Sequence, residues 1–364
     1  MKTKEFFEKL VELFPDVATS GTYTRPQVQE TVKALGDTNI RNYMVANKVA
    51  RGVYQLPSAK KDDVYPLDEL SVSSNSIPTV DPNFVPFGNY NDLESIISAG
   101  IFYPSYVFGP TGNGKSTMVE QICAQHNRSL IRVNLNMMTD EDQLIGSKTL
   151  KNGNVQIVEG PVLIAMRTGA VLLCDEIDAA SANTIMCLQA ILEGKPYYFK
   201  LKNETIIPKP GFNIIATANT KGKGSDDGRY IGTNILNEAF LERFAVTFEQ
   251  EYPSAKIEFK IVSKLMEQFN CVDENFASLI VKWADTIRKT YDDGGVDELI
   301  TTRRIAHIVR AFAIFKDQDK AIKLCCNRFD ITTKTAFIDL YDKMKPDDTT
   351  VDVTTPSKLE EIPF

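Results

Sequence analysis

The sequence predicts an α/β fold: a parallel sheet covered by helices, followed by a helical domain and preceded by a small winged-helix-like module. In the middle of the chain, short β-branched runs alternate with helical patterns, as in parallel strands joined by crossover helices. After about residue 253 only helical periodicity continues. The first 57 residues follow the order helix, helix, helix and strand, which is typical of a winged helix.

The pattern divides the chain into five segments. They are a winged-helix-like module over 1–57, a linker over 58–77, an α/β core over 78–252, a helical domain over 253–345 and an acidic tail over 346–364. The linker is rich in Ser, Asp and Lys, which is typical of a connecting segment. The tail is rich in Thr, Asp and Pro, a composition that favours disorder.

Each segment has its expected elements. The strands of the sheet are expected over 106–108, 130–134, 171–174, 213–217 and 245–248. The helices of the helical domain are expected over 257–269, 276–291, 303–315 and 333–343. In the N-terminal module we expect helices over 6–14, from Arg25 to about Gly36 and over 39–49, and then a strand over 51–57.

Composition bounds the function classes. The net charge is −7, which argues against a protein that coats nucleic acid over its whole surface. No apolar run is long enough to cross a bilayer, and the first residues do not form a signal region, so we expect a cytoplasmic protein without membrane contact. The six cysteines show no C-x-x-C spacing, which favours reduced thiols over a zinc site.

A glycine-rich segment after the first expected strand predicts a phosphate-binding loop. It matches G-x-x-x-x-G-K-[ST] and leads into a helical pattern, the context that this motif requires. Its backbone N–H groups and the helix N-terminus would face phosphate oxygens, a lysine would reach the β- and γ-phosphates, and a serine would bind Mg²⁺. We therefore expect ATP and Mg²⁺ to bind at Gly109, Pro110, Thr111, Gly112, Asn113, Gly114, Lys115, Ser116 and Thr117.

Two later strands end in polar residues that complete this site. Asp175 and Glu176 follow a buried strand, at the edge of a parallel sheet where ligands bind. We expect Asp175 to hold Mg²⁺ and Glu176 to activate the attacking water. Asp178 is a weaker candidate, because it lies past the strand end. Asn219, at the end of the next strand, is expected to orient the water and contact the γ-phosphate.

These residues resemble those of AAA+ ATPases, and within them the branch of MoxR-type ATPases and the ATPase subunit of aerobic cobaltochelatase. The resemblance covers about residues 78–310. The stretches that carry it are 116–121 (STMVEQ), 131–135 (IRVNL), 142–146 (DQLIG), 159–162 (EGPV), 216–220 (ATANT) and 230–233 (YIGT).

The resemblance implies further roles. Segments 151–156 and 197–207 resemble two hairpins that line the central face of a ring in such relatives and touch the substrate protein; the alternative is two surface hairpins. Arg243, in the segment LERF, resembles an arginine finger delivered from a neighbouring subunit, and Arg229 is a second candidate. This chemistry implies a homo-oligomer, most often a hexamer. An internal salt bridge of Arg243 is the alternative.

A second arginine role comes from the helical domain. The segment TTRRI at 301–305 resembles a sensor that reaches the γ-phosphate, and Arg303 is the candidate. Arg304 remains the alternative, because the sequence does not set the register of adjacent arginines. Partners of this branch often carry a von Willebrand A domain, so such a protein partner is expected.

The two ends of the chain suggest other contacts. Between residues 25 and 61 seven bases face two acids, so the N-terminal module could dock on DNA or on an acidic protein. The chain ends in Ile362, Pro363 and Phe364 after two glutamates. This ending is similar to the acidic tip of bacterial single-stranded-DNA-binding proteins, which implies docking to proteins that recognise such a tip; a chance ending is the alternative.

The sequence thus predicts a ring-forming AAA+ ATPase that couples ATP binding and hydrolysis to the remodelling of a protein client. Three alternatives stay open at this point: the ATPase subunit of a cobalt chelatase, a DNA-associated motor, and a scaffold switched by nucleotide with little hydrolysis. The paired carboxylates and the arginines argue against the scaffold.

Overall fold

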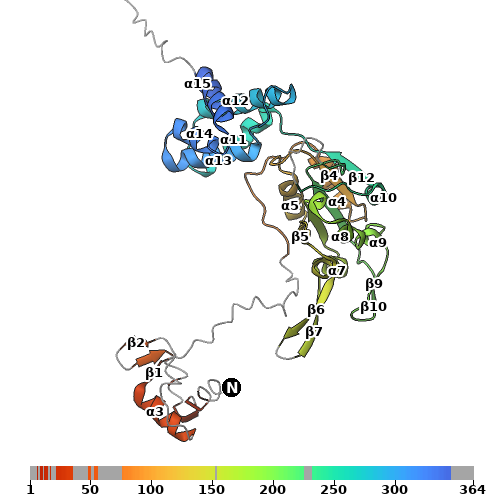
Figure 1. Ribbon diagram of the computed structural model, residues 1–364, viewed down its shortest axis with the longest axis vertical. Coiled ribbons are helices and arrows are strands. Elements are labelled where there is room, and N and C mark those ends of the chain that lie inside the picture. Colours follow the sequence, from red (N-terminus) through yellow and green to blue (C-terminus); the bar gives the residue numbers. More distant parts are fainter. Residues whose placement is uncertain are drawn as a thin grey trace, which may run out of the picture. The chain divides into compact units, whose positions relative to one another are not determined.

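The computed structural model describes residues 6, 9–10, 12–14, 17, 22–35, 48–50, 53–55, 76–151, 154–224 and 232–345 (Figure 1). The chain separates into two units, residues 1–71 and residues 72–364, which are treated individually below. Among the described residues, no helix combines the length and the apolar character that a membrane span requires.

The N-terminal unit contains a small antiparallel sheet. Its strands are β1 (Thr22–Thr24), β2 (Lys48–Ala50) and β3 (Val53–Gln55), in the order β1-β3-β2. Helix α3 (Arg25–Ala34) starts at the expected place, after a capping box between Thr24 and Gln27. Its buried Val28 and Val32 pack with apolar residues of the first helical segment.

One prediction for this unit is wrong. The helix expected over 39–49 cannot include its last two residues, because Lys48 and Val49 belong to strand β2. Pairing with β3, in which Lys48 lies opposite Tyr54, takes precedence over a helical pattern that extends only a few residues. The rest of that segment lies outside the described residues, so the winged-helix order stays a prediction.

A five-stranded parallel sheet forms the centre of the second unit. The strand order is β12-β4-β11-β8-β5, and every neighbouring pair is parallel. The bounds are β4 (Ser105–Phe108), β5 (Leu130–Asn134), β8 (Val171–Asp175), β11 (Asn213–Ala218) and β12 (Val246–Glu249). Each expected strand is present within one residue at either end, and the predicted α/β fold is confirmed.

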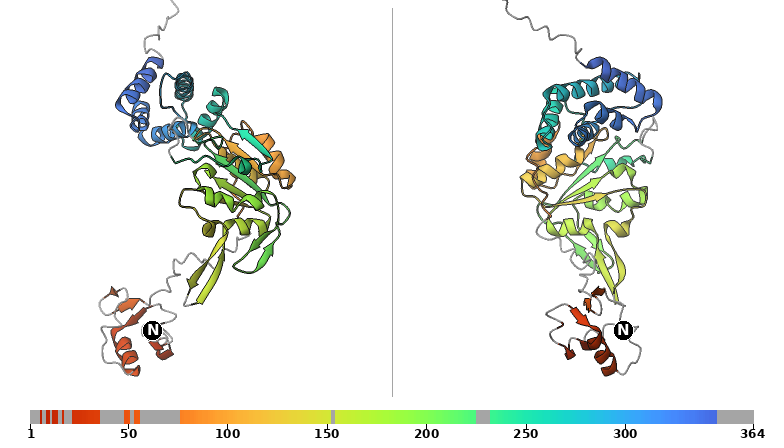
Figure 2. Two further views of the ribbon diagram at one scale, coloured as in Figure 1. Left: turned by 45° about the vertical axis from the view of Figure 1, so that its right-hand side comes forward. Right: turned by 90° about the vertical axis from the view of Figure 1, so that its left-hand side faces the viewer.

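Helices cover both faces of this sheet (Figure 2). Val107, Leu173 and Ile215 pack with α4 (Tyr90–Ala99) and α5 (Lys115–Gln125). The intervening residues, such as Leu172 and Ile214, face the other way, because side chains alternate along a strand. They pack with α7 (Pro161–Thr168), α8 (Ala182–Met186) and α9 (Gln189–Leu192). Shorter elements are α6 (Glu141–Leu144), the 3-10 turn η3 (Ile177–Ala179) and α10 (Glu238–Leu241).

Two antiparallel hairpins extend from the same end of the core (Figure 1). They are β6 (Gly146–Lys151) with β7 (Asn154–Glu159), and β9 (Tyr197–Phe199) with β10 (Glu204–Ile206). Arg167 of α7 links them: its guanidinium lies 2.9 Å from Glu159, at the base of the first hairpin, and 2.5 Å from Glu204, next to the turn of the second. Both hairpins expected from the resemblance are therefore present as structural elements.

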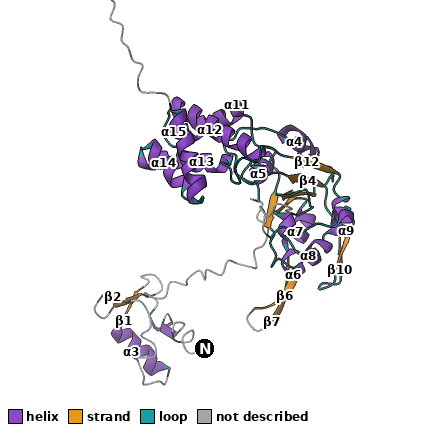
Figure 3. Ribbon diagram, turned by 45° about the horizontal axis from the view of Figure 1, so that its top comes forward, coloured by secondary structure: helices purple, strands orange, loops and turns teal. Residues whose placement is uncertain are grey.

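The described residues that follow β12 form a helical domain (Figure 3). It contains α11 (Ala255–Gln268), α12 (Glu274–Asp292), α13 (Thr302–Phe315), α14 (Gln318–Cys326) and α15 (Ile331–Met344) around a core centred on Trp283. Helix α14 was not expected from the sequence. Lys316, in the left-handed region, ends α13, and the Asp317 side chain accepts from the Lys320 N–H and starts α14 two residues later.

Candidate nucleotide site

The predicted phosphate loop joins β4 to α5. Gly112 and Gly114 have φ values of 70° and 88°, in the left-handed region that favours glycine. Gly114 is the N-cap of α5, so the free N–H groups of the first helical turn face the pocket. The same helix end carries a partial positive charge, which suits an anion such as a phosphate.

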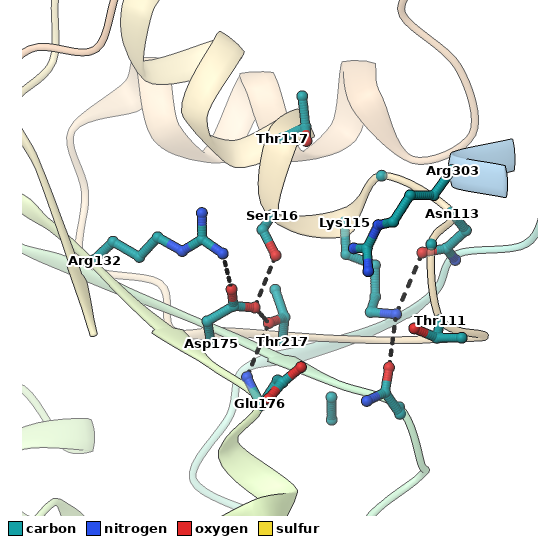
Figure 4. Close-up of a pocket in the computed structure, with 14 residues that line it drawn as sticks. Thr111, Asn113, Lys115, Ser116, Thr117, Arg132, Asp175, Glu176, Thr217 and Arg303 are labelled. Carbon is teal, nitrogen blue, oxygen red and sulfur yellow. Dashed lines mark hydrogen bonds and ion pairs between the residues drawn. The ribbon is translucent and has the colours of Figure 1, made fainter. Parts of the chain in front are cut away.

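The side chain of Lys115, the first residue of α5, turns back to the carbonyl groups of this loop. Its Nζ donates to the Gly109 carbonyl oxygen at 2.7 Å. It also donates to Asn113 Oδ1 at 3.3 Å and to Asn219 Oδ1 at 3.4 Å (Figure 4). Burial lowers the pKa of Lys115 to about 8, although the nearby carboxylates of Asp178 and Asp175 act in the opposite direction. A buried cation among loop carbonyls is well placed to receive phosphate oxygens.

Asp175, at the end of β8, is held on both carboxylate oxygens. Ser116 Oγ donates to its Oδ1 at 2.7 Å, and Thr217 Oγ1 donates to the same oxygen. Arg132 of β5 pairs with Oδ2. Burial opposes ionisation, but these hydrogen bonds and the Arg132 charge outweigh it and hold the pKa of Asp175 below its ordinary value. Asp175 is therefore an ionised oxygen ligand beside the Ser116 hydroxyl.

Sequence reasoning missed Thr217 and Arg132. Thr217 was expected only as the last residue of the strand over 213–217 and as part of the stretch ATANT, although a polar residue in a fully buried strand was a usable signal. Arg132 gave no signal in the sequence, because only the parallel pairing of β5 with β8 brings it next to Asp175.

Glu176 follows β8 directly and lines the pocket with Asp175. Its φ of 57° places a non-glycine residue in the left-handed region, and its N–H donates to Thr217 Oγ1 at 3.3 Å. Strained backbone of this kind is concentrated at functional sites. The turn directs the Glu176 side chain to the pocket instead of continuing the alternation of the strand (Figure 4).

Asp178 does not line the pocket, so its carboxylate is not placed to act on a bound nucleotide. It is fully buried, and its Oδ2 accepts from the Asn219 N–H and the Thr220 N–H, each at 3.0 Å. The Thr220 hydroxyl donates to the same oxygen at 2.9 Å. Asp178 thus holds the segment that carries Asn219, whose side chain does line the pocket.

These side chains enclose a polar pocket of about 360 Å³, next to a second, mainly apolar pocket of about 260 Å³. The second pocket is lined by Phe84, Val85 and Phe87 and by residues of α11 and α13, and both pockets share the loop from Gly112 to Gly114. The polar lining suits phosphates, and the apolar lining suits a nucleobase. Sequence analysis had not singled out the Phe84–Phe87 segment.

Comparisons with known proteins agree with this geometry. Residues 105–244 match a family model described as an AAA domain of the dynein-related subfamily. An uncharacterized protein of Staphylococcus saprophyticus is 32% identical over 218 residues, which are 57% of this chain and 76% of that protein. The aerobic cobaltochelatase subunit CobS of Sinorhizobium sp. is 27% identical over 270 residues, covering 72% and 77%.

This chain belongs to the AAA+ ATPases, in the MoxR and CobS branch. It is an ATP hydrolase that uses ATP and Mg²⁺, as its family implies. Among solved structures, the RuvB Holliday junction branch migration motor of Thermotoga maritima is similar with a TM-score of 0.44 and 14% identity, over 71% of this chain and 74% of that one.

The residues of this AAA+ ATPase fit magnesium and nucleotide. Among the described residues, no group of three or more His, Cys, Asp or Glu side chains forms a metal site of its own. Mg²⁺ usually takes one or two protein ligands together with phosphate oxygens and water, and Ser116 and Asp175 offer this set. Bound there, the ion would neutralise charge between the β- and γ-phosphates.

Of the arginines that the sequence singled out, the structure places Arg303 at the pocket and Arg304 and Arg243 away from it. Arg303 of α13 lines the polar pocket, and its backbone N–H donates to the Gly112 carbonyl oxygen at 3.2 Å. Arg304 is not a lining residue; it lies near Cys325 and Cys326. Arg243 is also outside the pocket, with its Nε 3.0 Å from Glu193 Oε1. Arg229 lies outside the described residues.

Proposed function

We propose that this AAA+ ATPase forms a ring and couples ATP hydrolysis to the remodelling of a protein client. In this scheme Lys115 and the loop N–H groups hold the phosphates, and Glu176 takes the proton of the attacking water. Asn219 and Arg303 contact the transferring phosphoryl group from the core and the helical domain. The supporting geometry is the convergence of Lys115, Glu176, Asn219 and Arg303 on one pocket.

The position of Arg243 carries the ring proposal. Hydrolysis by this family relies on an arginine that stabilises charge on the transferring phosphoryl group. Arg243 is instead paired with Glu193 away from its own pocket, and a neighbouring subunit is the partner to which it could be delivered. The paired contact is also the internal salt bridge that sequence analysis kept as the alternative.

Mixing two inactive variants tests this point. Glu176→Gln and Arg243→Ala should each lose most turnover, whereas a mixture should regain a substantial part of it. In mixed rings, some sites combine Glu176 of one subunit with Arg243 of the next. If Arg243 acts only within its own subunit, mixing restores nothing, and the ring proposal is wrong.

The first hairpin supports a protein client. Leu150 and Val155 are cross-strand partners near its free end and remain 76% and 65% exposed. Tyr198 on the second hairpin is 52% exposed. Exposed apolar side chains on projecting elements favour contact with another polypeptide.

A photo-cross-linker at position 150 in the Glu176→Gln background tests client contact. It should capture protein in an ATP-dependent manner, and a cross-linker at the exposed Ser98 of α4 provides the control. Equal capture at both positions, with and without ATP, would contradict the client proposal.

A second candidate function is the ATPase subunit of a cobalt chelatase, favoured by the identity to CobS over 72% of this chain. ATP-dependent cobalt insertion with a cognate partner separates the two. A von Willebrand A-type partner and a cytoplasmic location also belong to the proposal. DNA docking by the N-terminal module and docking of the tail at Phe364 concern residues that are largely or wholly outside those described, and both stay predictions.

A further inference from the structure

The phosphate loop is contacted from outside the core on two neighbouring carbonyl groups. Tyr252, in the connection between β12 and α11, donates its hydroxyl to the Thr111 carbonyl oxygen at 2.8 Å. The Arg303 N–H donates to the next carbonyl oxygen, that of Gly112. A Cβ atom added at Gly112 would come within 3.1 Å of Arg303 Cβ and 3.0 Å of Thr301 Oγ1. The start of α13 therefore packs directly against the loop.

Tyr252 also contacts the helical domain. The guanidinium of Arg288, on α12, lies over the Tyr252 ring at 4.3 Å from its centroid. Arg288 is buried and makes a two-point ion pair with Glu258 of α11, at 2.9 Å and 2.8 Å. Its Nε donates to the Ile300 carbonyl oxygen at 2.8 Å. The orientation of this guanidinium is thus set on three sides.

The same ion pair holds the first turn of α13. Glu258, which is fully buried, accepts on Oε1 from the Thr302 hydroxyl at 2.6 Å, in addition to the bond from Arg288. Thr302 is the first residue of α13, and Arg303 follows it. The segment from Ile300 to Thr302 is therefore fixed by Arg288 at one end and by Glu258 at the other.

A buried ion pair is a poor device for stability alone. The cost of removing both charges from water is similar to their attraction, so well-packed apolar side chains often do as well. What the pair supplies here is geometry, because its hydrogen bonds run to the residues just before Arg303.

We infer that Glu258, Arg288, Thr302 and Tyr252 form a positioning network, which sets Arg303 against the phosphate loop and links the loop to the helical domain. The inference rests on the proposed role of Arg303 at the γ-phosphate. None of the four residues reacts; each acts through Arg303 or through the Thr111 carbonyl.

A double-substitution cycle tests the network. Thr302→Val removes the hydroxyl bonded to Glu258 and should lower kcat about tenfold, since a hydrogen bond to a charged group is lost. Thr302→Ser keeps the hydroxyl and should retain most of kcat. In the Arg303→Ala background, Thr302→Val should have no further effect on kcat. Thr286→Val, at a half-buried site of α12 whose hydroxyl donates to the Lys282 carbonyl oxygen of the same helix, is the control.

The outcomes separate the two levels of argument. If Arg303→Ala leaves kcat unchanged, the proposed role of Arg303 fails, and the network inference fails with it. If Arg303→Ala lowers kcat but Thr302→Val lowers it by the same factor in both backgrounds, only the network inference is overturned.

Tyr252→Phe gives an independent measurement that does not depend on the folding of the Thr302 variants. It removes one hydroxyl and keeps the ring beneath Arg288. We expect kcat/KM for ATP to fall about fivefold, with the melting temperature close to that of the natural protein. The control is Tyr103→Phe, at the other end of β4 from the phosphate loop. Equal kinetics for the two variants would refute the link.

Discussion

Replacing Asp178 with alanine is the sharpest test of how the site is supported. The Asp178 carboxylate is fully buried and accepts two backbone N–H groups and one hydroxyl on a single oxygen. Alanine would leave the N–H groups of Asn219 and Thr220 without this partner. Each unsatisfied buried donor costs about 1–3 kcal/mol, so the two together would lower the free energy of unfolding by about 2–6 kcal/mol.

This loss converts to a measurable melting temperature. At about 2–4 °C per kcal/mol for a domain of this size, a loss of about 4 kcal/mol lowers the melting temperature by roughly 8–16 °C. Asp178→Asn keeps an acceptor oxygen in the same place, so its melting temperature should lie much closer to that of the natural protein. Glu267→Ala, at an exposed position of α11, is the control for loss of a carboxylate.

Turnover should follow the same order, because Asp178 holds the backbone of Asn219. We expect ATP hydrolysis by Asp178→Ala to fall more than by Asp178→Asn, measured at a temperature where both remain folded. If Asp178→Ala melts with the natural protein and hydrolyses ATP at the same rate, the carboxylate does not support this segment, and the reasoning is refuted.

Three further predictions concern the pocket itself. Glu176→Gln should bind ATP with little change in Kd, measured by calorimetry. Its turnover, measured by phosphate release, should fall about 10²- to 10⁴-fold. Turnover above a tenth of the natural value would contradict the general-base role. Because burial lowers the pKa of Lys115 to about 8, its ammonium group loses a proton between pH 7 and 9 in the free protein. The Kd for ATP should therefore rise about tenfold over that range. A constant Kd would count against contact between Lys115 and the phosphates. Thr217→Val removes the hydroxyl that donates to Asp175 and should lower turnover or Mg²⁺ affinity about 10- to 100-fold. Thr217→Ser keeps the hydroxyl and should retain most of the turnover and Mg²⁺ affinity. Equal losses in both variants would exclude the hydroxyl as the cause.

The sequence by itself determined the parts of the site that are local in the chain. The segment from Gly109 to Thr117 needs only its own glycines, its lysine and the strand and helix beside it, so its spacing was enough to predict the loop. The strand ends at Asp175 and Asn219 were also predictable, because a buried strand has a recognisable pattern and parallel strands end at one edge of a sheet.

The tertiary structure alone decided the contacts between residues that are distant in the chain. Adjacent arginines on a helix point about 100° apart, so the burial of Ile305, Ile308 and Val309 had to orient α13 before Arg303 rather than Arg304 could line the pocket. Asp178 was expected to be a weak catalytic candidate, yet its partners lie about 40 residues away and make it a support for Asn219. Such contacts depend on how strands and helices pack, and no local spacing encodes them.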